Sequence, residues 1–193
     1  MLRAISGLIR LTSGEIWFDG KRIDRVSPKD IVTWGIAHVP EGRMIFPNMT
    51  VYENLKMGAY TRKDREEIKR DLEKVYHYFP ILRERTRQQG ESLSGGEQQM
   101  LAIGRCLMPK AKMILMDEPS IGLSPMMVKM IGKVISDINR NEGVSILLVE
   151  QNTRLALRLA QKGYVLETGK VSLEGNSGDL IKDERVKKAY LGG

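Results

Sequence analysis

Cysteine is almost absent from this sequence, in which Cys106 is the only one among 193 residues. A fold held together by internal disulfides is therefore excluded, and the composition indicates a reducing compartment. Because Cys106 stands beside Leu107 and Met108 in an apolar helical pattern, we interpret it as a small buried side chain rather than a reactive thiol.

Long apolar runs are missing as well. No stretch approaches the roughly 18 consecutive apolar residues of a membrane-spanning helix. The first residues lack the basic segment and the cleavage site of a secretory signal. We therefore expect any contact with a membrane to depend on a partner protein.

Aromatic side chains make up only 6% of the residues, which argues against stacking platforms for single-stranded nucleic acid. The net charge of +7 permits contact with nucleic acid or anionic lipid but does not require it. Basic and acidic residues alternate between Arg62 and Asp71, a pattern typical of a solvated helix face rather than a stripe that follows phosphates. We expect no nucleic-acid partner.

Short apolar runs and amphipathic helical patterns alternate along the chain. Residues from Leu2 to Ile9 have helical spacing, and two glycine-containing turns predict a β-hairpin over 15–23. Further strands are expected at 36–39, 113–116, 144–149 and 164–166, and further helices from 50, over 100–108, over 124–142 and over 155–160. This alternation predicts an α/β fold whose parallel sheet has right-handed crossovers and helices on both faces.

A helical sub-lobe is predicted between the strands at 36–39 and 113–116. Apolar residues recur at helical spacing from Ile68 to Phe79, which predicts a helix over 61–79. Thr61 and Asp64 have the spacing of a capping box, and Pro80 is the expected end. We expect one domain over residues 1–193 with a helical subdomain at about 52–110.

Two carboxylates, Asp117 and Glu118, directly follow the apolar run 113–116. A carboxylate at the carboxyl end of a buried strand stands where α/β folds bind ligands. In nucleotide hydrolases an aspartate at this place holds the magnesium shell, and a neighbouring carboxylate orients or polarises the attacking water. Asp117 and Glu118 suit these two roles, although an acid pair at a strand end can also cap the next turn.

A segment with two adjacent glycines, residues 93–98, precedes the carboxylates by the length of one helix. Gly95 and Gly96 would let backbone amides approach a phosphate at the start of that helix, where the dipole and the free donors favour an anion. Ser94 adds a hydroxyl donor. A glycine turn with a serine cap would explain the start of the helix alone, but not the whole of the segment.

The two segments together strongly resemble ATP-binding cassette (ABC) ATPases. Residues 93–98 match the family's signature motif and residues 113–118 match its Walker B motif, in the family's order. The resemblance implies a P-loop NTPase-like fold, ATP and Mg²⁺ as ligands, Asp117 in the magnesium shell and Glu118 as a catalytic carboxylate. The fifth signature residue, most commonly glutamine, is Glu97 here, a variant of several branches. The implied nucleotide contacts, made in trans, are Leu93, Ser94, Gly95, Gly96, Glu97 and Gln98.

Three further segments place the chain within the family. Residues 39–55 resemble the Q-loop region, which senses the γ-phosphate and touches the transmembrane subunit, and Glu41 stands at the metal-contacting position where glutamine is usual. Residues 149–152 align with the switch segment, where catalytic Gln151 replaces a common histidine and can hydrogen-bond a phosphate but carries no charge. Residues 119–125 resemble the D-loop, which comprises Ser120, Gly122, Leu123 and Ser124.

Val-Pro-Glu-Gly-Arg, Gly-Leu-Ser-Pro and Val-Glu-Gln-Asn together are similar to the ATPase subunits of branched-chain amino-acid importers, and the resemblance extends to residues 189–192. It implies a peripheral subunit at the cytoplasmic face of the plasma membrane that couples ATP hydrolysis to uptake of hydrophobic amino acids. The implied partners are a second ABC ATPase subunit, identical or different, the transmembrane permease subunits and, indirectly, a substrate-binding protein. Import of urea or amides is an alternative, because the permease and the receptor select the substrate.

No G-x-x-x-x-G-K-S/T phosphate loop occurs in the sequence. In this family the segment from Leu2 to Ile9 would directly follow that loop. Loss of three charge-assisted hydrogen bonds would remove roughly 5 kcal/mol, or several thousandfold in affinity. We therefore do not expect the chain by itself to bind ATP tightly.

Two interpretations of this gap stay open. The sequence begins inside a predicted helix, which favours the interpretation that it is a complete ATPase truncated at its N-terminus. The core strand that precedes the phosphate loop would then be missing as well, and would leave its neighbours with open edges. Alternatively, a short non-catalytic cassette lends its signature to an intact partner, since cassettes of this family pair head to tail. A soluble ABC protein acting on DNA or ribosomes is a third class, although such proteins usually carry long insertions or paired cassettes.

Overall fold

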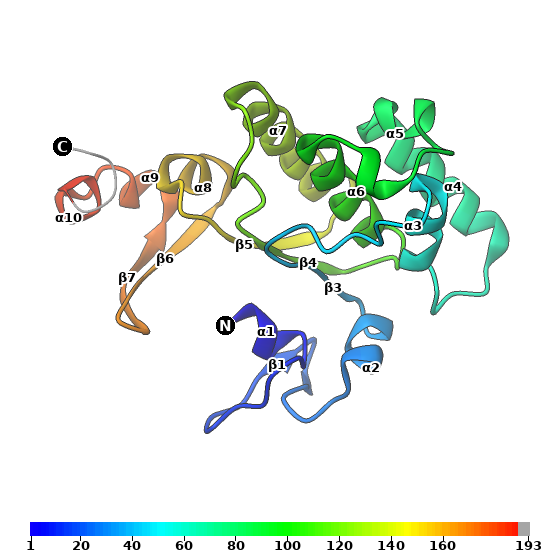
Figure 1. Ribbon diagram of the computed structural model, residues 1–193. Helices are drawn as coiled ribbons and strands as arrows, with labels where there is room; N and C mark the ends of the chain where they lie inside the picture. The colour runs from blue at the N-terminus through cyan, green and yellow to red at the C-terminus, as the bar shows by residue number, and fades with distance from the viewer. Residues whose placement is uncertain (189–193) are drawn as a thin grey trace. The chain divides into compact units, whose positions relative to one another are not determined.

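The computed structural model describes residues 1–188 (Figure 1). Contacts within the chain divide it into two units, residues 1–147 and the residues from 148 onward. The segment 189–192, to which the family resemblance extends, lies outside the described residues.

A three-stranded sheet lies at the centre of the first unit, and its last strand extends two residues beyond the unit. Its order is β3-β4-β5, where β3 is Ile36–Val39, β4 is Met113–Asp117 and β5 is Ser145–Val149. The first two strands run parallel in a register that pairs Ile36 with Met113 and Val39 with Met116. The middle of β4 is fully buried and wholly apolar, as expected of a strand covered on both faces. The expected parallel sheet is thereby confirmed.

Helices cover both faces of this sheet. Figure 1 shows α6 and α7 on one side of the strands, with α1 and α2 on the other, and α2 contacts β3 while α1 contacts β4. The helices of the unit are α1 (Leu2–Ile5), α2 (Pro28–Thr33), α3 (Val51–Gly58), α4 (Arg65–Tyr78), α5 (Pro80–Glu84), the 3₁₀ turn η1 (Gly90–Ser92), α6 (Gly95–Leu107) and α7 (Pro125–Glu142).

Local sequence explains where the long helix α7 begins and ends. The Ser124 hydroxyl accepts a hydrogen bond from the Met127 amide, and Pro125 occupies the first turn, where its missing N–H has no consequence. Gly143 ends the helix at φ 66°, a left-handed conformation that glycine adopts without steric penalty. The apolar face between these ends packs into the core through Ile131, Val134, Ile135 and Ile138.

Two hairpins complete the part of the chain that the structure describes. Strands β1 (Trp17–Phe18) and β2 (Lys21–Arg22) pair antiparallel at the expected place. In the second unit, α8 (Thr153–Leu159) leads to strands β6 (Lys162–Glu167) and β7 (Lys170–Asn176), which are followed by α9 (Ser177–Leu180) and α10 (Glu184–Val186).

The strand expected at 164–166 joins a hairpin rather than the parallel sheet. Strand β6 pairs antiparallel with β7. Thr168 and Gly169 both have positive φ, at 48° and 76°, which suits a tight two-residue turn between twisted strands. This turn was not recognised in the sequence.

Two helical boundaries also differ from expectation. Helix α1 ends at Ile5, before Gly7 at φ 72°, although apolar spacing continues to residue 9. Helix α4 begins at Arg65, and Asp64 makes no side-chain cap, because both carboxylate oxygens accept hydrogen bonds from Arg62. Pro80 starts α5, where a first-turn proline is favourable, as well as following α4.

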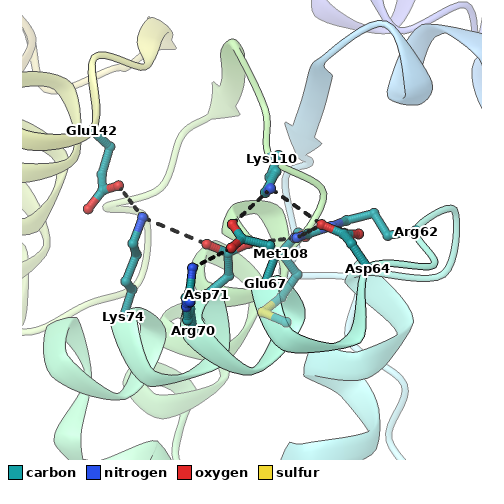
Figure 2. A network of polar contacts seen from close by, with 9 residues as sticks. All are labelled: Arg62, Asp64, Glu67, Arg70, Asp71, Lys74, Met108, Lys110 and Glu142. Atoms are coloured by element: carbon teal, nitrogen blue, oxygen red, sulfur yellow. Dashed lines mark hydrogen bonds and ion pairs between the residues drawn. The ribbon is translucent and has the colours of Figure 1, made fainter.

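A network of charges joins α4 to the end of α6 and to the end of α7 (Figure 2). Arg62 is its centre: the guanidinium contacts Asp64 at 2.7 Å and Asp71 at 2.6 Å, and donates to the Met108 carbonyl at the end of α6. Arg62 holds the pKa of the Asp64 carboxyl far below its usual range. Because that pKa is lowered, the pair's contribution to stability is full at neutral pH and is lost only in strong acid.

Replacement of Arg62 with methionine is expected to destabilise the protein by about 2–3 kcal/mol, because it leaves the largely buried Asp71 with only a distant cation. Urea denaturation would measure the change. Arg70→Met is the matched control, since Arg70 pairs with Glu67 on the surface and its loss should cost under about 0.5 kcal/mol. Equal losses in the two variants would contradict the anchoring role of Arg62.

Candidate nucleotide site

The carboxyl end of β4 presents the two predicted acids. Asp117 is the last residue of the strand, and Glu118 follows in a left-handed conformation at φ 46°. Such a conformation costs roughly 1–2 kcal/mol in a residue that has a Cβ. Strain of this kind is typical of functional sites, and here it turns the chain sharply between the strand and the following loop.

Glu41 lies at the same edge of the sheet. Val39 on β3 pairs with Met116 on β4. Asp117 directly follows Met116, and Glu41 comes two residues after Val39. The carboxyl ends of parallel strands share one edge, so the structure brings these two predicted metal contacts to one region.

The start of α6 carries the segment with the two glycines. Ser94 caps the helix: its hydroxyl accepts from the Glu97 amide, and the Glu97 carboxylate accepts from the Ser94 amide at 2.8 Å. Because the hydroxyl only accepts in this capping box, its hydrogen stays available for donation. Glu97 also contacts Arg85 at 3.1 Å. The variant fifth residue therefore stabilises the helix start.

A hollow of about 360 Å³ opens beside this helix start. Ser94 and Gly96 line one side, and Gly122 and Ser124 line another, so the signature segment and the predicted D-loop border the same space. The Met127 side chain lies over Gly96. A Cβ added to Gly96 would lie 2.5 Å from the terminal methyl group of Met127. Only glycine fits at position 96 without moving that side chain.

Gln98 has an internal structural task. Its amide nitrogen donates to the Gly90 carbonyl at 3.2 Å, and its amide oxygen accepts from Arg43 at 3.2 Å. The contact with Arg43 joins the loop after β3 to α6, and sequence reasoning did not assign Arg43 a role. Nothing in the residue spacing signalled it, because the two positions are 55 residues apart.

His38 on β3 is a second polar group that the sequence left unassigned. Its Nδ1 lies 3.1 Å from the Ser6 hydroxyl, and its buried Nε2 has no hydrogen-bond partner among residues 1–188. Burial lowers the pKa of His38, whereas the Asp117 carboxylate opposes that shift. His38 pairs with Leu115, two residues before Asp117, so both side chains belong to one face of the sheet.

Gln151 belongs to the second unit, where it precedes α8 and is exposed. Its carbonyl accepts a hydrogen bond from the Thr153 amide. The assignment of Gln151 to the catalytic site stays a prediction.

Within residues 1–188, no group of three or more acidic, histidine or cysteine side chains could hold a metal ion alone. The donor set of magnesium in nucleotide sites usually comprises one or two carboxylates, water and the substrate's phosphates. Asp117 and Glu41 fit that requirement. For ATP, the chain offers the hydroxyl and amides of residues 94–96 but no phosphate-binding loop.

Comparison with known proteins places the chain in a family. A family model described as "ABC transporter" matches residues 1–121. All 193 residues match 82% of the high-affinity branched-chain amino acid transport ATP-binding protein BraG of Pseudomonas aeruginosa, at 42% identity. The probable branched-chain amino acid transport ATP-binding protein LivF of Archaeoglobus fulgidus is 36% identical, with 100% of the chain and 81% of the relative covered.

A solved structure supports the same placement. The chain is similar to a nucleotide-free ATP-binding cassette from an ABC transporter, with a TM-score of 0.82 and 25% identity over 100% of this chain and 82% of that one. In the part of the chain that the structure describes, no helix has both the length and the apolar character needed to cross a bilayer.

Proposed function

This chain belongs to the ABC transporter family, and from that premise we propose that it is the ATP-binding subunit of an importer of branched-chain amino acids. The observation that carries the substrate class is the 42% identity to BraG over the whole chain. The Ser94-capped start of α6, which borders one hollow with the predicted D-loop, supports its action at a nucleotide.

Each proposed residue has a defined task. Ser94 donates its hydroxyl hydrogen, and Gly95 and Gly96 offer backbone amides, to the terminal phosphate of a nucleotide held by a second ATPase subunit. Asp117 and Glu41 would hold Mg²⁺, which would neutralise charge on the phosphates when bound. Glu118 orients the attacking water and accepts its proton, and Gln151 hydrogen-bonds a phosphate oxygen.

The proposed assembly follows from this division of tasks. Cassettes of the family dimerise and act with transmembrane permeases, so we propose a second ATPase subunit and a permease as partners at the cytoplasmic face of the membrane. A subunit of this kind would receive its substrate specificity from the permease and its receptor. The helical subdomain proposed over about 52–110 contains α3 to α6, all of which belong to the first unit.

Equilibrium binding of a fluorescent ATP analogue to the 193-residue chain tests one part of this proposal, that the signature segment acts on a nucleotide held by a second subunit. We expect no saturation at micromolar concentrations for the chain alone, because the sequence has no phosphate loop. Mixed with an intact ATP-binding subunit, the chain should raise that subunit's turnover by lending its signature segment. A Ser94→Ala chain is the control for this gain. Micromolar affinity of the chain alone, or the same gain with Ser94→Ala, would contradict the division of tasks.

A further inference from the structure

The loop after β3 has an unusual backbone. Gly42, Arg43 and Met44 are consecutive residues with positive φ, at 78°, 68° and 44°. Glycine adopts this conformation freely, but Arg43 and Met44 do so against steric resistance from their Cβ atoms. Strain at two adjacent residues persists only where surrounding contacts enforce it, and it commonly marks a functional position.

The strained loop directs the Arg43 guanidinium onto the start of α6. A Cβ placed on Gly95 would lie 2.8, 2.9 and 3.0 Å from Nη2, Nη1 and Cζ of Arg43. Three guanidinium atoms at nearly equal distances indicate that the group lies flat against the glycine. Nη1 also donates to the Gln98 amide oxygen at 3.2 Å, one turn further along the helix.

The same guanidinium approaches the loop after β4. A Cβ on Gly122 would lie 3.9 Å from Nη2 of Arg43, which is ordinary van der Waals distance. The guanidinium therefore packs on the signature segment and lies near the predicted D-loop. Its own backbone lies two residues from Glu41, so the side chain links the loop that carries Glu41 to the start of α6.

Charge makes a purely stabilising role for this contact unfavourable. A cation at the N-terminal end of a helix opposes the helix dipole. Among the described residues, Arg43 has no carboxylate in an ion pair with it, and the Gln98 amide that it does contact is neutral. An apolar or amide side chain would pack against Gly95 without that penalty.

We infer that Arg43 is a positioning residue that fixes the loop after β3 to the start of α6, and so holds Glu41 and the donors of residues 94–96 at a constant spacing. The functional part of this inference, its consequence for ATP hydrolysis, rests on the proposed function. The mechanical part, that Arg43 holds the loop against α6, concerns this chain alone. The two parts are therefore tested separately.

Amide hydrogen exchange of the 193-residue chain tests the mechanical part. Arg43→Ala is expected to accelerate exchange about tenfold at the hydrogen-bonded amides of residues 44–49 and 97–98, while the melting temperature changes by less than about 2 °C. Arg65→Ala, at an exposed arginine at the start of α4, is the control and should change neither region. Unchanged exchange in Arg43→Ala would overturn the inference.

Two more variants distinguish the flat contact from the charge. Gly95→Ala keeps Arg43 but places a methyl group where the guanidinium lies, so it should reproduce the exchange pattern of Arg43→Ala. Arg43→Lys keeps the charge but has no planar face or fork, and should not restore protection. An immobilised guanidinium should also give a resolved Arg43 side-chain NMR signal that Gln98→Ala broadens. Full protection in Arg43→Lys would overturn the contact described.

The functional part is measured as turnover by an intact ATP-binding subunit mixed with this chain. Arg43→Ala should lower the chain-dependent kcat about tenfold with KM changed less than twofold, as expected when alignment rather than binding is lost. If the unsubstituted chain supports no turnover, the proposed function fails, whereas hydrogen exchange still decides the role of Arg43. Altered exchange with unaltered kcat would overturn the catalytic consequence.

Discussion

Replacement of Glu118 with glutamine is expected to lower ATP turnover by roughly 100- to 10,000-fold, the range typical of losing a general base. The assay requires a chain extended at its N-terminus by a segment with the G-x-x-x-x-G-K-S/T motif, so that the nucleotide has its phosphate loop. Glutamine keeps the size of the side chain and can still hydrogen-bond water, but it cannot accept a proton at neutral pH. Nucleotide binding should persist, because it depends on the phosphate loop and on Asp117.

Glu84→Gln is the matched control, since Glu84 is exposed at the end of α5. Turnover of this variant should equal that of the parent chain. Steady-state turnover and equilibrium nucleotide binding would be measured on the same preparations. Substantial turnover in Glu118→Gln would contradict the proposed role of Glu118, and loss of nucleotide binding would show that Glu118 serves binding rather than proton transfer.

Replacement of Gly58 with alanine is expected to destabilise the protein by about 3 kcal/mol, and to lower its melting temperature by roughly 6–12 °C for a chain of this size. Gly58 ends α3 where that helix packs on α6, and an added Cβ would lie 2.2 Å from the Arg105 carbonyl oxygen. The obstacle is backbone, with Met108 also only 2.9 Å away, so the two helices must separate. Thermal denaturation followed by circular dichroism would measure the loss.

Gly178→Ala provides the control for this substitution. A Cβ on Gly178 meets nothing within 4 Å, so the change should be neutral or stabilising by up to about 1 kcal/mol, the propensity difference between the two residues in a helix. A small effect at Gly58, comparable to that at Gly178, would be incompatible with the close approach of α3 and α6.

Local signals predicted the elements that depend on local physics. The run at 113–116 lies between breakers and is too short for a helix, and it forms β4 with one further residue. Ser124 with Pro125 predicted the start of α7, because the cap and the proline act within one turn. The strand at 164–166 was assigned to the wrong kind of pairing because the turn at Thr168 and Gly169, which pairs it with the next strand, was not recognised.

The residues of the candidate site also divide into those that local sequence predicts and those whose contacts join distant positions. Asp117 and the Ser94–Gly96 segment could be predicted because their chemistry resides in contiguous residues and matches a family pattern. Arg43 and His38 were not found, since their contacts with Gln98 and Ser6 join positions 55 and 32 residues apart. The positive φ at Arg43 is enforced by tertiary contacts, and the residue type alone does not encode it.

The buried thiol of Cys106 makes the chain well suited to site-specific labelling. Its sulfur donates to the His38 carbonyl, and burial raises its pKa to about 11. At pH 7 only about one molecule in 10,000 would carry the reactive thiolate, and that sulfur is shielded from reagents. A cysteine introduced at an exposed position should therefore react with a maleimide dye or spin label without first removing Cys106, so distances within the working protein could be measured on an otherwise native chain.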